Sequence, residues 1–112
     1  MTESSDGATD PADDLFWDVA RELMNDDERL VQGTIMSSQC LRVGKEFCAM
    51  PHHKAQGIVV KLPKERVSEI IEAGDGESFA PAGKVFKEWL AVLELDEARW
   101  RQLLLESIEF VG

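Results

Sequence analysis

The stretch from Cys40 to Leu62 constrains the fold of this chain more than any other part of the sequence. Two apolar runs in it are separated by Gly44-Lys45, and glycine at the first position of a two-residue loop suits the type II′ turn of a β-hairpin. A third run, Ile58 to Leu62, is β-branched and too short for a helix, and the loop from Pro51 to Gly57 lets it return beside the second strand. The stretch therefore predicts a three-stranded antiparallel sheet.

The flanking sequence predicts helices that pack on this sheet. Apolar residues recur at helical spacing, and the helix signals Asp10-Pro11, Pro63, Gly74 and Asp96 delimit helices near 11 to 25, 63 to 73 and 96 to 111. Residues 29 to 36 and 88 to 93 are predicted strands, and 78 to 83 are predicted to be irregular, with Phe79 in the core. The expected fold class is α+β, a small antiparallel β-sheet with helices packed on it, in the order α-β-β-β-β-α-β-α.

Length and charge indicate one domain with an acidic end. We expect residues 1–9 to form a disordered acidic tail and residues 10–112 a single domain. The net charge is −10, and residues 1–28 hold ten acidic residues and one base, so the rest is nearly neutral. This balance disfavours non-specific nucleic-acid binding and leaves a local basic patch open. With no long apolar run and no basic leader, the sequence predicts a cytoplasmic protein without a membrane segment.

The sequence contains one group of residues that could ligate a soft metal, namely Cys40, Cys48, His52 and His53. Their Cys-x₇-Cys-x₃-His-His spacing matches no structural zinc pattern. In the predicted hairpin register Leu41 lies opposite Cys48, which directs the two cysteines to opposite faces of the sheet. We therefore expect two unpaired thiols, no metal and no cofactor. Because no convergent acid–base or nucleophile set is evident, we also expect no enzyme.

Several segments resemble a known family. They are Cys40 to Met50, Val60 to Pro63, Glu65-Arg66, Phe79 with Pro81, and Lys87-Glu-Trp89. Together, over about residues 15 to 111, the chain resembles the N-terminal domain of the TfoX (TfoX/Sxy-like) family and the related MmcQ/YjbR-like proteins. The resemblance implies a small domain with helices on an antiparallel sheet, a link to the regulation of competence genes, and no established catalytic residues. Members often show Met-Phe-Gly before the hairpin, where this chain has Ile35-Met36-Ser37.

Two classes of function remain open. The first is a non-enzymatic interaction or regulatory domain, whose partner is a protein or a second copy of the chain. The second is a nucleic-acid-associated transcriptional or competence regulator, which the resemblance suggests and the acidic charge opposes.

Strand alternation predicts where an interaction surface lies. Leu41, Val43, Cys48 and Met50 share one face of the hairpin, which we expect the helices to cover. Ala49 and the candidate interaction surface lie on the other face; the surface has an apolar centre flanked by two bases and comprises Arg42, Phe47, Val59 and Lys61. The alternative is that a helix or a second copy of the chain buries these residues.

Overall fold

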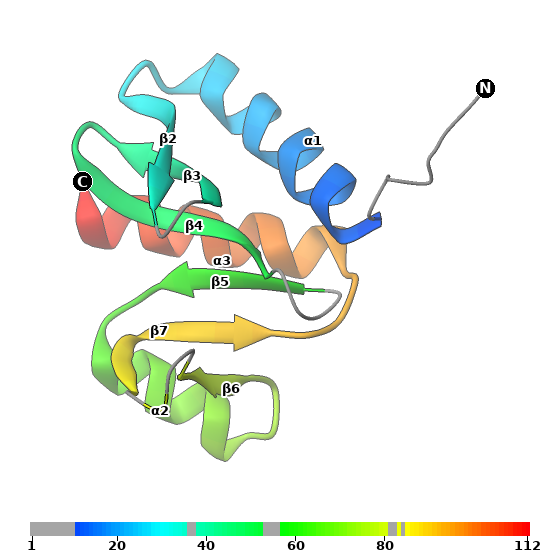
Figure 1. Ribbon diagram of the computed structural model, residues 1–112, viewed down its shortest axis with the longest axis vertical. Coiled ribbons are helices and arrows are strands. Elements are labelled where there is room, and N and C mark those ends of the chain that lie inside the picture. The colour runs from blue at the N-terminus through cyan, green and yellow to red at the C-terminus, as the bar shows by residue number, and fades with distance from the viewer. Residues whose placement is uncertain (1–10, 36–37, 53–56, 81–82, 84) are drawn as a thin grey trace.

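The computed structural model describes residues 11–35, 38–52, 57–80, 83 and 85–112, and its fold is α+β (Figure 1). The described helices are α1 (Pro11–Asp26), α2 (Lys64–Glu72) and α3 (Glu97–Val111). One antiparallel sheet has the strand order β2-β3-β4-β5-β7-β6, formed by β2 (Leu30–Ile35), β3 (Ser38–Val43), β4 (Glu46–His52), β5 (Gly57–Lys61), β6 (Glu77–Phe79) and β7 (Phe86–Val92).

All three described helices contribute to the core on one side of the sheet, which we call the helix-covered face. Phe16 of α1, Val67 of α2 and Trp100 of α3 belong to the same buried cluster as Ile58 and Val60 of β5. In Figure 1 the strand β4 passes in front of α3, so the viewer looks at the opposite side of the sheet, which we call the second face. Of the four residues that were expected to face the helices, Leu41, Val43 and Cys48 do so, and Met50 does not.

The helix boundaries follow local signals in the sequence. Helix α1 begins at Pro11, whose fixed φ and missing N–H suit the first helical position. Before α3, the Asp96 side chain accepts a hydrogen bond from the backbone N–H of Arg99 at 3.1 Å. After α2, Gly74 has φ of 81°, and the N–H groups of Gly74 and Asp75 donate to carbonyls of the last turn. The three predicted helices are therefore confirmed.

A β-bulge at Cys48 sets the register of the central hairpin. Leu41 pairs with Ala49 and Arg42 with Phe47, so one step along β3 corresponds to two steps along β4. Cys48 is the extra residue of this bulge. The two-residue loop is confirmed, but the predicted pairing of Leu41 with Cys48 is wrong because a regular ladder was assumed.

The bulge exchanges the faces of two side chains. Ala49 belongs to the helix-covered face and Met50 to the second face, the reverse of the prediction. Cys40 and Cys48 nevertheless lie on opposite faces, and both are free thiols, as predicted. The buried hydroxyl of Ser107 in α3 donates to the Cys48 carbonyl at 3.1 Å, so a helix far along the chain supports the bulge.

One strand was not predicted. Residues Glu77–Phe79 form β6, which pairs with β7 at the edge of the sheet, where the sequence was interpreted as irregular. A three-residue strand carries too little pattern to be recognised, and it is formed because β7 offers a free edge. Phe79 is buried as predicted, on the second face.

Three predictions concern residues outside the described part of the chain. They are the tail at 1–9, the helix signal at Asp10 and the place of His53 in the group that could ligate a metal. None of the described helices is long and apolar enough to cross a membrane.

Candidate functional site

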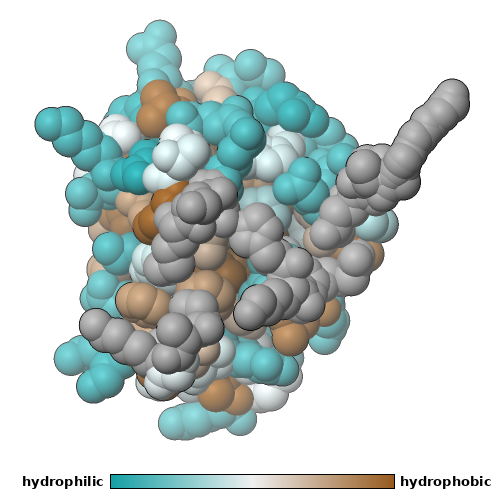
Figure 2. All heavy atoms as spheres, in the orientation of Figure 1, coloured by the Kyte–Doolittle hydropathy of each residue, from teal (hydrophilic) through white to brown (hydrophobic). Residues whose placement is uncertain are grey.

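The predicted interaction surface lies on the second face, but its apolar centre is buried. Phe47 is 6% exposed and Val59 is 0% exposed. Both belong to a cluster of strand residues on this face: Cys40, Phe47, Met50, Val59 and Phe79, with Ile35, Phe86 and Trp89 packed against them. Figure 2, which views this side, shows some of the described apolar side chains near the middle, others close to the upper and lower edges, and hydrophilic side chains around most of the outline. The apolar centre of the predicted surface is therefore buried by other strand residues of its own face, and its role in binding a partner stays a prediction.

The aromatic rings of this cluster stack on one another. The Trp89 ring lies 4.5 Å from Phe47, 4.8 Å from Phe86 and 5.5 Å from Phe79 between centroids, with interplanar angles of 23–30°. A platform for nucleic-acid bases must present ring faces to solvent. Because the faces of Trp89 are occupied by neighbouring rings, this cluster is better described as a small second core.

The two basic residues of the predicted surface, Arg42 and Lys61, lie on different strands, β3 and β5. Arg42 is half-buried and donates to two backbone carbonyls, that of Thr34 at 2.6 Å and that of Lys45 at 2.7 Å. Lys61 is half-buried and lies opposite Trp89 in the ladder. The structure thus places all four residues of the predicted surface on one face. Arg42 has a structural role there, because it hydrogen-bonds to two backbone carbonyls.

The described residues supply no activated nucleophile. Burial raises the pKa of the Cys48 thiol to about 11, and burial likewise raises the pKa of the Cys40 thiol. At neutral pH both are therefore protonated, whereas a reactive cysteine needs a lowered pKa. The part of the chain that the structure describes also holds no group of three or more His, Cys, Asp or Glu residues that could bind a metal ion.

An open groove between α2 and α3 is a more exposed candidate. It has a volume of about 690 Å³ and is lined by Pro63, Arg66, Ala98, Arg101, Gln102, Leu105, Glu106, Glu109 and Phe110. Leu105 is 49% exposed and Phe110 is 39% exposed. These two large side chains project from the side of α3 that does not meet the sheet, because Trp100, Leu103 and Leu104 occupy the buried side.

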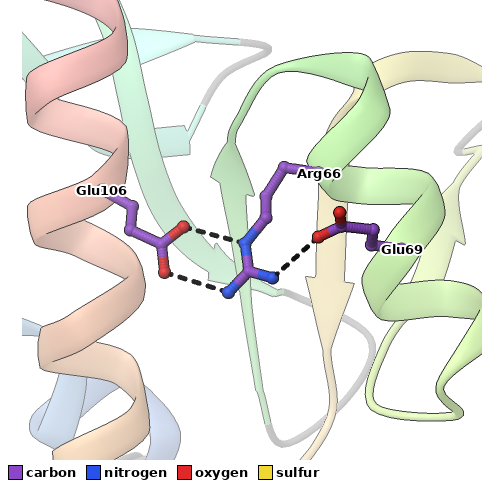
Figure 3. Close-up of polar contacts among 3 residues, drawn as sticks. All are labelled: Arg66, Glu69 and Glu106. Atoms are coloured by element: carbon purple, nitrogen blue, oxygen red, sulfur yellow. Dashed lines mark hydrogen bonds and ion pairs between the residues drawn. The ribbon is translucent and has the colours of Figure 1, made fainter.

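Arg66 holds the two walls of the groove together. Its Nε and Nη2 donate to the two carboxylate oxygens of Glu106 at 2.9 and 3.2 Å, and its Nη1 donates to Glu69 at 3.1 Å (Figure 3). The hydrogen bonds to Glu106 and then Glu69 raise the pKa of Arg66 above its already high ordinary value, so the guanidinium stays charged. The pair fixes α2 against α3 with a planar, two-point contact.

The second arginine of the groove, Arg101, also contacts two carboxylates. Arg101 Nη2 lies 2.8 Å from Glu22 of α1 and 3.2 Å from Glu97 of α3. With Glu109, the groove and its rim present five carboxylates against two guanidinium groups, an excess of three negative charges. The groove is thus an apolar strip inside an acidic border.

Sequence reasoning did not find this groove. The helical pattern of α3 shows Leu105 and Phe110 outside the buried stripe, and that was the available signal. Their grouping with Pro63 and Arg66 depends on how α2 is placed beside α3. A second hollow, between α2 and the β6–β7 edge, has Val85 as its exposed large apolar side chain.

Comparison of the chain with protein-family models, with curated proteins and with solved structures finds no match in any of the three. The function must therefore be argued from the groove itself.

Proposed function

We propose that this chain is a non-enzymatic protein-interaction domain, and that the groove between α2 and α3 binds a basic, amphipathic segment of a partner protein. The observation that supports this best is the pair of exposed side chains Leu105 and Phe110 inside an acidic border. A helix with an apolar stripe and basic flanks complements both features.

The state of the two arginines favours a basic partner. Arg66 and Arg101 each contact two carboxylates, so neither offers an uncompensated positive charge to an acidic ligand. Glu109 adds a further carboxylate beside Leu105 on the exposed side of α3. Basic residues of a partner would therefore gain charge complementarity around the apolar contact.

The remaining properties agree with a binding role in the cytoplasm. Both cysteines are free thiols, the usual state in a reducing compartment. A regulatory role of the kind that the TfoX resemblance implies would then be exerted through a protein partner. Direct nucleic-acid binding is the alternative, and the net charge of −10 opposes it.

The test uses a fluorescein-labelled helical peptide with leucines on one face and lysines on the other, and fluorescence anisotropy with the full chain. Leu105→Asn should weaken binding roughly three- to tenfold, because full burial of a leucine contributes about 1.5–3 kcal/mol and a partner would bury the exposed half of this side chain. The matched control Val85→Asn alters an equally exposed apolar residue outside the groove and should bind as the unaltered chain does.

The charge requirement is tested separately. Glu109→Lys should weaken peptide binding several-fold, and the loss should shrink as salt is raised. Glu28→Lys makes the same change of charge at an exposed site outside the groove and should have little effect. Equal binding by Leu105→Asn and Val85→Asn would contradict the proposal, and a salt-dependent mobility shift with duplex DNA would favour nucleic-acid binding instead.

A further inference from the structure

Strand β2 is an edge strand with few of the usual safeguards against pairing. Among the described strands it pairs only with β3, and its six residues, Leu30–Ile35, include no charged residue and no proline. Val31 is 42% exposed. Native proteins commonly blunt such edges with charges, prolines or short strands, because an open edge is a template for another chain. The opposite edge follows this rule, since β6 has three residues and begins with Glu77.

The direction of the backbone groups of β2 can be assigned. In an antiparallel ladder the N–H and C=O of one residue point to the same side, and the sides alternate along the strand. The carbonyl of Arg29 accepts from Gly44 N–H at 2.9 Å, so odd-numbered residues face β3. Leu30 N–H donates instead to Asp27, away from the ladder. The carbonyl of Thr34 therefore points to the outer edge.

Arg42 reaches this outer carbonyl from the neighbouring strand. Its Nη2 donates to Thr34 O at 2.6 Å, while its Nη1 donates to the carbonyl of Lys45 at 2.7 Å. The side chain crosses β2 at Gly33, where an added Cβ would lie 2.5 Å from Arg42 Nε and 2.6 Å from Cδ. Glycine at this position leaves the space that the arginine occupies.

We propose that Arg42 is a guard, which occupies the outer edge of β2 and prevents it from pairing with β2 of a second copy of the chain. The length and composition of β2 indicate why the strand that would pair with it is β2 of a second copy of the chain. Two identical strands of six uncharged residues can pair antiparallel about a twofold axis with no like charges opposed. Pairing β2 with β6 of another copy would match six residues to three and bring Glu77 to the contact. This inference is independent of the groove between α2 and α3.

The test measures self-association of the full chain by sedimentation velocity, with circular dichroism to confirm the fold. The unaltered chain should not associate through β2, whereas Arg42→Gln should lower the dimer dissociation constant at least tenfold. Gly33→Ala should act in the same direction, because the added methyl displaces the arginine while leaving it in the sequence. Lys45→Gln is the matched control: it removes the same charge nearby, keeps the carbonyl that Arg42 uses, and should leave association unchanged.

A second substitution, which should reverse the association, tests whether the chains associate through β2. Adding Val31→Lys to Arg42→Gln places a charge on the exposed edge and should restore the monomer. Folded Arg42→Gln and Gly33→Ala chains that remain monomeric would overturn the proposal. So would an association that Val31→Lys does not reverse, or an unaltered chain that already dimerises and is dissociated by Val31→Lys. If one of the two guard variants does not fold, the other decides the outcome.

Discussion

Replacing Ser107 by alanine tests how the bulge at Cys48 is stabilised. The serine is fully buried, and its hydroxyl donates to the Cys48 carbonyl at 3.1 Å. Removing the donor from a buried carbonyl costs about 1–3 kcal/mol. Alanine is the better helix former and returns about 0.5 kcal/mol within α3. We expect the free energy of unfolding to fall by about 0.5–2.5 kcal/mol.

The matched control is Ser68→Ala in α2. Ser68 is exposed in the interior of a helix, so the substitution gains helix propensity and loses no buried hydrogen bond. It should raise the free energy of unfolding by about 0.5 kcal/mol. The difference between the two substitutions isolates the hydrogen bond, at about 1–3 kcal/mol.

Urea unfolding followed by tryptophan fluorescence measures both variants. A loss of 1 kcal/mol corresponds to roughly 4 °C in the melting temperature of a domain of this size. Equal stability changes for the two variants would refute the view that Ser107 supports the bulge. A lower stability for Ser107→Ala with an unchanged urea dependence would support it.

Three further predictions follow from single contacts. Because burial raises the pKa of Cys48 from 9.0 to about 11, the stability that its thiol contributes should be complete below pH 9 and lost between pH 9 and 11, by up to about 3 kcal/mol. Urea titrations at several pH values check this against Cys48→Ala, which keeps the pH dependence of the buried Cys40 and should lack the part due to Cys48. Gly57→Ala should destabilise the fold by more than about 2 kcal/mol in the same assay, because its Cβ would lie 2.0 Å from the Val92 carbonyl, and stability close to that of the unaltered chain would contradict this packing. Glu106→Gln should cost about 1 kcal/mol or less at low salt, since its ion pair with Arg66 is partly exposed, and a loss that salt does not reduce would be inconsistent with an electrostatic origin.

Much of the fold could be predicted because its signals are local. Gly44 between two apolar runs specifies the hairpin turn, and its φ of 61° is one that glycine adopts without strain. Pro11, Asp96 and Gly74 mark helix boundaries through backbone groups within a few residues of themselves. Such signals act before any tertiary contact is made, so they can be read from the sequence alone.

The candidate site depended on contacts between distant residues. Phe47 and Val59 were placed on the correct face, but strand alternation could not show that Trp89, some 40 positions after Phe47, would bury its ring. The exposed strip at Leu105 and Phe110 likewise becomes part of a groove only where α2 lies beside α3.

The sequence by itself determined the three helices, five of the six described strands, the two-residue turn and the division of the cysteines between two faces, because each depends on neighbours along the chain or on strand alternation. Tertiary structure decided the bulge at Cys48, which a hydroxyl 59 positions away supports, and the pairing of α2 with α3 through Arg66 and Glu106, which are 40 positions apart. It also decided that Arg42 caps the edge of β2 and does not project into solvent. The physical reason is that a polar or charged side chain can form hydrogen bonds or ion pairs with many alternative partners. The packing of the helices and strands decides which of them comes within reach.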